Sequence, residues 1–126
     1  MSMRILILDN EPMVVETLVT ILSQDPLFEM RTAYRGSEAI ELANQQDFDA
    51  FICDISLPDM TGIDVVREMR FRRICPPFVM MISGAVKAAP RGVSSDTIFI
   101  PKPFNPVEII SILHGVHNRK ERQSRS

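Results

Sequence analysis

The sequence contains few of the features that staple small secreted proteins or hold proteins in membranes. Its 126 residues include only two cysteines, Cys53 and Cys75, and these form no Cys-x-x-Cys pair. This spacing excludes a disulfide framework and a zinc ligand set, so both residues are expected to be reduced thiols. The longest apolar runs, such as residues 78–82, reach about five residues, far below the roughly 18 needed to span a bilayer.

A secretory leader and a broad basic surface are missing as well. Residues 5–8 are apolar, but Asp9 ends this run before it is long enough for a signal peptide. The chain has 14 Lys and Arg against 16 Asp and Glu, a net charge of −2, and four of the basic residues lie in residues 119–126. This balance excludes a nucleic-acid-binding surface over the whole body. We therefore expect a cytoplasmic protein with no membrane contact and no nucleic-acid binding by this domain.

What the sequence does contain is a regular alternation of short apolar runs and amphipathic helical patterns. Strands are predicted at residues 4–8, 28–33, 50–53, 78–82 and 97–100. Helices are predicted to begin at Pro12, Ser37, Thr61 and Asn105. Such alternation predicts one α/β domain with a parallel sheet and helices on both faces.

Two segments depart from this regular pattern. Residues 84–96 contain Pro90 and Gly92, so the fourth helix is predicted to be short or irregular. Residues 119–126 are polar and basic, and we expect them to fray as a tail or as the start of a linker. The folded domain is therefore predicted to cover residues 1–118.

Polar residues stand directly after several of the predicted strands. Asp9, Asn10 and Glu11 follow the first strand, Asp54 follows the third, Ser83 the fourth and Lys102 the fifth. The carboxyl ends of parallel strands meet at one edge of the sheet, where ligands of such folds bind. Carboxylates suit Mg²⁺, and an aspartate beside such a cation can attack phosphorus while an amine and a hydroxyl neutralise charge. The residues therefore predict a site for phosphoryl transfer.

These motifs resemble a known family. Asp9-Asn10-Glu11, Asp54 with Pro58 and Gly62, Ser83-Gly84 and Lys102-Pro103-Phe104 together resemble the receiver domain of two-component response regulators, in the CheY-like superfamily. The resemblance covers about residues 3–117. It implies a flavodoxin-like (βα)5 three-layer sandwich with parallel strand order 2-1-3-4-5. It also implies a signalling switch that is at most a catalyst of its own phosphorylation and dephosphorylation.

The resemblance further implies partners and a phosphorylation site. Asp54 is expected to receive a phosphoryl group from a sensor histidine kinase or a histidine phosphotransfer protein. Ser83 and Lys102 would contact the phosphoryl oxygens, and Phe99 stands at the aromatic switch position. The Lys102–Pro103 bond would be cis. The modified domain would act on a downstream protein target or an output domain, and whether it forms a homodimer stays open.

A Mg²⁺ site is implied in the same way, with one departure from the family pattern. Asp9, Asn10, Asp54 and the backbone carbonyl of Ser56 stand at the metal-holding positions. The second acidic position carries Asn10 instead of aspartate, which removes one negative charge, so we expect weaker Mg²⁺ binding. Glu11 is open to two interpretations, as a member of the site or as an acid favoured by the helix N-terminus.

Two other functions compete with the phosphoacceptor switch. Asn10 and the irregular fourth helix are compatible with a degenerate receiver that binds a protein without being phosphorylated. A small phosphohydrolase or nucleotide-binding domain is the third alternative. It is disfavoured because the sequence has no P-loop, no G-x-G-x-x-G fingerprint and no Asp-x-Asp after the first strand.

Overall fold

The computed structural model describes residues 2–84 and 89–125. Its strands are β1 (Met3–Leu8), β2 (Phe28–Ala33), β3 (Ala50–Asp54), β4 (Phe78–Ser83) and β5 (Ile98–Pro101). Its helices are α1 (Pro12–Leu22), α2 (Gly36–Gln45), α3 (Gly62–Phe71) and α4 (Pro106–Arg125). Each predicted strand is found, with its limits shifted by no more than one residue.

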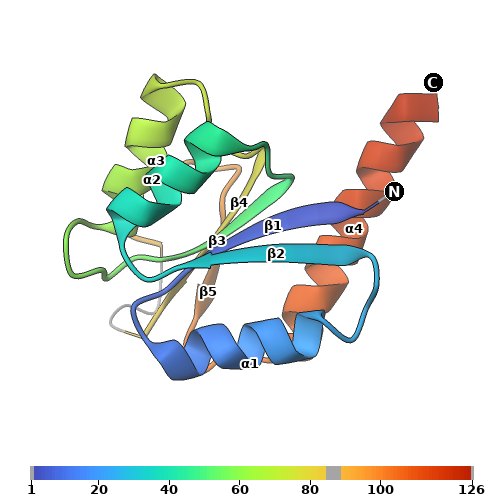
Figure 1. The fold of residues 1–126 in the computed structure, drawn as a ribbon, viewed down its shortest axis with the longest axis horizontal. Helices are drawn as coiled ribbons and strands as arrows, with labels where there is room; N and C mark the ends of the chain where they lie inside the picture. The colour runs from blue at the N-terminus through green and yellow to red at the C-terminus, as the bar shows by residue number, and fades with distance from the viewer. Residues whose placement is uncertain (1, 85–88, 126) are drawn as a thin grey trace.

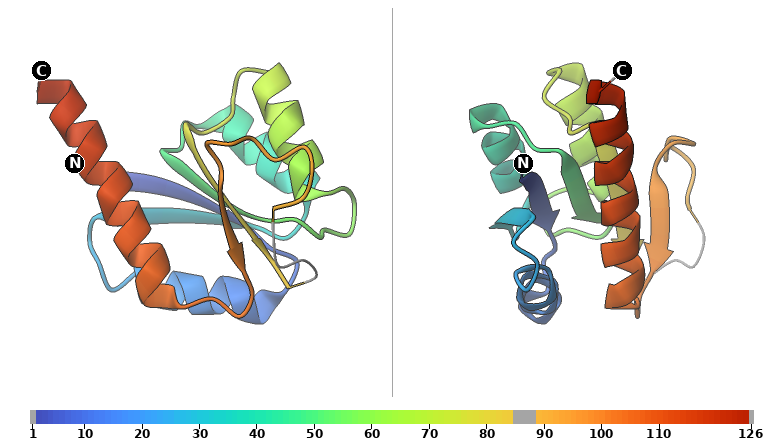
Figure 2. Two further views of the ribbon diagram at one scale, coloured as in Figure 1. Left: turned by 180° about the vertical axis from the view of Figure 1, so that it is seen from behind. Right: turned by 90° about the vertical axis from the view of Figure 1, so that its right-hand side faces the viewer.

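The strands form one parallel sheet in the order β2-β1-β3-β4-β5. Helices α2 and α3 cover one face of this sheet, and α1 and α4 cover the other, which gives three layers (Figures 1 and 2). The predicted flavodoxin-like fold and strand order are therefore confirmed.

Each face of the sheet has its own apolar core because successive side chains of a buried strand point to opposite faces. On β1, Ile5 and Ile7 pack with residues of α1 and α4, whereas Leu6 and Leu8 pack with residues of α2 and α3. Residues 5–8 are completely buried. This double burial explains why the strand is apolar throughout, without the alternation of a half-exposed strand.

The fourth helix of the predicted pattern is not found in the described part of its segment. Gly84 and residues 89–97 adopt turns, bends and irregular backbone, and residues 85–88 lie outside the described residues. Pro90 and Gly92, which has a φ of 93°, account for the lack of helix on the C-terminal side of the segment.

The C-terminal segment also differs from its prediction. We expected residues 119–126 to fray, but α4 continues to Arg125 and extends beyond the rest of the molecule (Figure 2), and Ser126 lies outside the described residues. The segment contains Arg, Lys, Glu and Gln, which favour helix, and the Lys120 ammonium forms an ion pair with Asp49. Among residues 2–84 and 89–125, no helix combines the length and the apolar content that crossing a membrane requires.

Candidate functional site

Two aspartates lie side by side at the carboxyl edge of the sheet. Leu8 pairs with Cys53 in the parallel ladder, so the residues that follow them, Asp9 and Asp54, are neighbours. Asp9 is fully buried and Asp54 is only 3% exposed. Burying two carboxylates next to each other is costly unless a cation or hydrogen bonds compensate. Their placement therefore indicates a site that binds positive charge.

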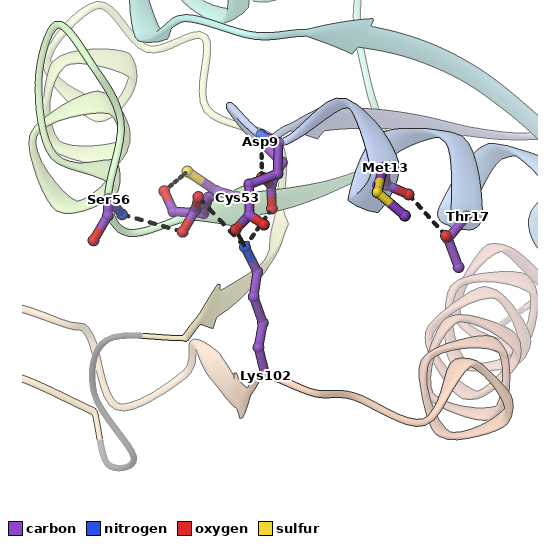
Figure 3. A network of polar contacts seen from close by, with 8 residues as sticks. Asp9, Met13, Thr17, Cys53, Ser56 and Lys102 are labelled. Atoms are coloured by element: carbon purple, nitrogen blue, oxygen red, sulfur yellow. Dashed lines mark hydrogen bonds and ion pairs between the residues drawn. The ribbon is translucent and has the colours of Figure 1, made fainter.

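Lys102 supplies positive charge to both aspartates. Its Nζ lies 3.0 Å from Asp9 Oδ2, 3.6 Å from Asp54 Oδ2 and 2.8 Å from Glu11 Oε1. The side chain reaches from the end of β5 across the edge of the sheet to the acidic group (Figure 3). Partial burial acts to lower the pKa of Lys102, but the three carboxylates outweigh this and raise the pKa above its ordinary value. The amine is therefore a firmly charged ammonium.

Backbone turns fix the directions of both aspartates. The amide of Glu11 donates to Asp9 Oδ1 at 2.8 Å, and the amide of Ser56 donates to Asp54 Oδ1 at 3.1 Å. In each case the carboxylate accepts from the residue two positions on, a turn that aspartate favours. The Lys102–Pro103 bond that follows β5 is cis, as predicted.

Gly62 packs against the backbone of the phosphoacceptor candidate. A Cβ at this position would lie 2.3 Å from the carbonyl oxygen of Asp54 and 2.9 Å from Cys53 Sγ. The Gly62 amide also donates to the carbonyl of Ile55 at 2.7 Å. The loop after β3 thus folds back on the strand end so closely that only glycine fits.

The surroundings of Asp54 make its carboxylate unusually basic. Burial and the negative charge of Asp9 raise its pKa from 3.8 to about 6, although Lys102 and the Ser56 amide oppose the rise. A carboxylate with a raised pKa is a stronger nucleophile when it is ionised, and at neutral pH it remains mostly ionised.

Asn10 contacts two of the atoms expected to hold a metal ion. With its amide oriented to satisfy its neighbours, the side-chain nitrogen donates to Asp54 Oδ2 at 3.0 Å and to the carbonyl oxygen of Ser56 at 3.3 Å. In this orientation Asn10 is a hydrogen-bond donor to the expected ligands. Its role as a ligand stays a prediction.

Ser83 and Phe99 lie where the sequence predicted, but their contacts do not assign their roles. Ser83 ends β4 and is 1% exposed, and its carbonyl oxygen accepts a hydrogen bond from the Lys102 amide at 2.7 Å. Phe99 is half-buried on β5 and packs against the core on the side of α2 and α3. The phosphoryl contact of Ser83 and the switch role of Phe99 remain predictions.

The donor set at this edge fits a hard cation. Asp9, Glu11 and Asp54 each offer a carboxylate oxygen, and these oxygens lie within 4.8 Å of one another. Asp9 Oδ2 is buried, and the Lys102 ammonium, 3.0 Å away, is its one partner among the described residues. A buried carboxylate oxygen with spare lone pairs is the kind of ligand that Mg²⁺ takes.

One functional neighbour was missed by sequence reasoning. The carboxylate of Asp59, in the loop after β3, accepts from the amides of Gly36 and Ser37 at 2.9 and 3.0 Å. These hydrogen bonds cap the N-terminus of α2, where Arg35 supplies no side-chain cap. They also lower the pKa of Asp59. An N-cap supplied from 23 residues further along the chain leaves no local signal in the sequence.

An open groove borders the site. Its volume is about 480 Å³, and it runs between the start of α1 and the β5–α4 connection. Met13, Val14 and Phe104 give it an apolar wall, and Glu11 and Lys102 form its polar end. Met13 is 79% exposed at the groove. The groove thus reaches two charged residues of the site, Glu11 and Lys102.

The family is decided by comparison with known proteins. The sequence profile of the response regulator receiver domain matches residues 5–114, which is most of the chain. The chain belongs to this family. It is thus a receiver domain, the phosphoacceptor module of two-component signalling, and the resemblance predicted from its strand-end motifs is confirmed.

Relatives and solved structures agree with this assignment. The cell cycle transcriptional regulator CtrA of Caulobacter vibrioides is 31% identical over 130 residues, which cover 98% of this chain and 54% of that protein. CtrA of Brucella ovis is 27% identical over 128 residues, with the same coverage. The chain thus spans about half the length of these curated relatives. The chemotaxis response regulator CheY4 of Vibrio cholerae is 26% identical, with a TM-score of 0.81 over 92% of this chain and 99% of that one.

Proposed function

We propose that this receiver domain accepts a phosphoryl group on Asp54 from a phosphohistidine of a sensor kinase or a phosphotransfer protein. An Asp54 carboxylate oxygen attacks phosphorus and forms a new P–O bond. The P–N bond to the donor imidazole breaks, and its electron pair stays with the imidazole nitrogen. The product is an acyl phosphate on Asp54 and a histidine without its phosphoryl group.

The residues around Asp54 can stabilise this transfer by position and charge. Lys102 is a charged ammonium 3.6 Å from Asp54 Oδ2, where it can neutralise a phosphoryl oxygen. Ser83, at the neighbouring strand end, is the second donor candidate. When bound, Mg²⁺ held by Asp9, Asp54 and the Ser56 carbonyl would neutralise further charge on the phosphoryl oxygens.

The observation that carries the proposal is the environment of Asp54. It is a nearly buried carboxylate of raised pKa, and it faces an ammonium at the carboxyl edge of the sheet. A purely structural aspartate gains nothing from this arrangement, because the burial of its charge next to Asp9 destabilises the fold. The added negative charge of a phosphoryl group would attract Lys102 and Ser83 and could draw Phe99 inward. We infer that this changes the surface presented to a downstream protein or an output domain.

A small acyl phosphate donor tests the proposal directly. The purified chain is incubated with acetyl phosphate and Mg²⁺, and its intact mass is followed with time. We expect a single phosphoryl adduct that the variant Asp54→Asn does not form, and Asp47→Asn, which changes an exposed aspartate, serves as the control. No adduct on the folded chain would favour a degenerate receiver, whereas repeated turnover of a phosphate ester would favour a phosphohydrolase.

A further inference from the structure

The cation site of this domain lacks the carboxylate that the family pattern places at position 10, where this chain has asparagine. The charges of Asp9, Asp54 and Lys102 sum to −1 at the edge of the sheet. The affinity of a site for a hard divalent cation depends on how many charged oxygens it offers. A third carboxylate that reaches the same point therefore matters for binding.

Asn10 does not fill this place in the structure. In the amide orientation that satisfies its neighbours, its nitrogen donates to Asp54 Oδ2 and to the Ser56 carbonyl oxygen, which are two of the expected cation ligands. To act as a ligand through its oxygen, the amide would have to rotate and give up both hydrogen bonds. An amide also brings no negative charge to the site.

Glu11 reaches the site from the next position in the chain. Its carboxylate oxygen lies within 4.8 Å of the oxygens of Asp9 and Asp54. Its backbone amide donates to Asp9 Oδ1 at 2.8 Å, which fixes the start of the side chain beside Asp9. Although Glu11 is the N-cap residue of α1, its side chain accepts no capping hydrogen bond. Glu11 therefore does not cap α1 through a side-chain hydrogen bond.

A second observation points to a ligand at this place. Asp9 is completely buried, and among the described residues its Oδ2 has the Lys102 ammonium as its one partner. Lys102 is paired at once with this oxygen and with Glu11, at 3.0 and 2.8 Å. One ammonium between three carboxylates leaves an excess of negative charge directed into the same small space.

We propose that Glu11 supplies the second acidic ligand of the divalent cation site, in place of residue 10. This inference rests on the proposed function, because it assumes that the receiver domain binds a divalent cation. The acidic pair of the site is then Asp9 and Glu11, separated by one residue. On binding, Glu11 exchanges its ion pair with Lys102 for the cation, and this leaves Lys102 available for a phosphoryl oxygen.

The test measures cation affinity without any phosphorylation. Mg²⁺ is titrated into the full chain by calorimetry, and Mn²⁺ by electron paramagnetic resonance, at fixed ionic strength. The variants are Glu11→Gln, the control Glu16→Gln and the double variant Asn10→Asp/Glu11→Gln. Glu16 lies exposed on the same helix, so its variant makes the same change of charge away from the site. Circular dichroism checks that each variant folds.

We expect Glu11→Gln to weaken cation binding about tenfold or more, the scale typical of losing a group that supports a metal site. Glu16→Gln should change the affinity less than about twofold, since exposed charges this distant are screened. The double variant has the net charge of the parent and should bind at least as tightly as the parent. The inference is overturned if Glu11→Gln binds like Glu16→Gln, or if the double variant binds no better than Glu11→Gln.

These outcomes are separate from failure of the proposed function. If the parent chain binds Mg²⁺ and forms the Asp54 adduct while Glu11→Gln binds equally well, only the role of Glu11 is wrong. If the parent chain binds no divalent cation and forms no adduct, the phosphoacceptor function fails together with this inference.

Discussion

Asp54 combines deep burial with a negative charge, and this has a measurable effect on stability. Its pKa of about 6 lies above the ordinary value of 3.8, so between these pH values the folded protein holds a proton that the unfolded chain releases. The contribution of Asp54 to the free energy of unfolding therefore falls as pH rises from about 4 to 6. Asp54→Asn should remove this contribution to the pH dependence. At pH 7 and without divalent cations, the free energy of unfolding of this variant should be about 1–3 kcal/mol higher than that of the parent chain. Urea unfolding of the parent chain and the variant at several pH values measures these free energies. The account of Asp54 is wrong if Asp47→Asn, a change at an exposed residue, has the same effect.

The same pKa sets the pH dependence of phosphorylation. Below pH 6 an increasing fraction of Asp54 is protonated, and a protonated carboxyl group is a poor nucleophile. A bound Mg²⁺ would lower the pKa of Asp54, so the profile is recorded at Mg²⁺ concentrations too low to fill the site. Under these conditions, with acetyl phosphate in excess, we expect the initial rate of adduct formation to fall about tenfold per pH unit well below pH 6. Intact mass at early times gives the rate. A rate that stays constant down to pH 4.5 would contradict the raised pKa.

Sequence reasoning identified most single residues of the site but could not settle Glu11 and Asp59. Asp54 ends β3, and Asp9 and Lys102 come directly after β1 and β5, so strand prediction was enough to bring the three together. Glu11 pairs with a lysine 91 residues away, and Asp59 caps a helix that begins 23 residues earlier. Contacts between residues so far apart along the chain leave no local pattern in the sequence.

Among the elements, the turn from β3 into α3 depends on the smallest side chain. Gly62→Ala would place a methyl group 2.3 Å from the Asp54 carbonyl oxygen, which requires the backbone to shift. We expect the free energy of unfolding to fall by about 1–3 kcal/mol or more. Gly115→Ala is the matched control in α4, since no described atom lies within 4 Å of its Cβ position. It should instead stabilise the chain by about 0.5–1 kcal/mol. Equal effects of the two variants in urea unfolding would refute the close packing at Gly62.

The elements were predictable where burial is strong and less so where it is weak. Strands β1, β3 and β4 are buried on both faces, so their apolar runs marked them clearly. The end of α4 was missed because its residues are polar and bury no apolar stripe. Their helical propensity and the contact of Lys120 with Asp49 keep the helix intact there.

For the whole molecule, the predicted domain boundary at residue 118 can be tested by truncation. The buried residues of α4 named in the core are Ile109 and Leu113, both before this point. A chain that ends at Asn118 should therefore fold, bind Mg²⁺ and form the Asp54 adduct as the full chain does. It should lose about 1 kcal/mol or less of unfolding free energy, because the contacts it removes include surface ion pairs such as Lys120–Asp49 and no residue named in the buried core.

Lys120→Met in the full chain separates the ion pair from the rest of the helix. The Lys120→Met variant should show most of the small decrease in unfolding free energy that truncation causes. A truncated chain that unfolds, or one that no longer forms the adduct, would show that the domain extends into the C-terminal half of α4.

The most direct test of the account is the position of the phosphoryl group. The chain is phosphorylated with acetyl phosphate and Mg²⁺, the acyl phosphate is reduced with borohydride to homoserine, and the peptides are sequenced by mass spectrometry. We predict homoserine at position 54 alone, with no homoserine at position 9 and no 2-amino-5-hydroxypentanoic acid, the product that a modified glutamate would give, at position 11. A modification at Asp9 or Glu11, or none on the folded chain, would contradict the claim that Asp54 is the phosphoacceptor.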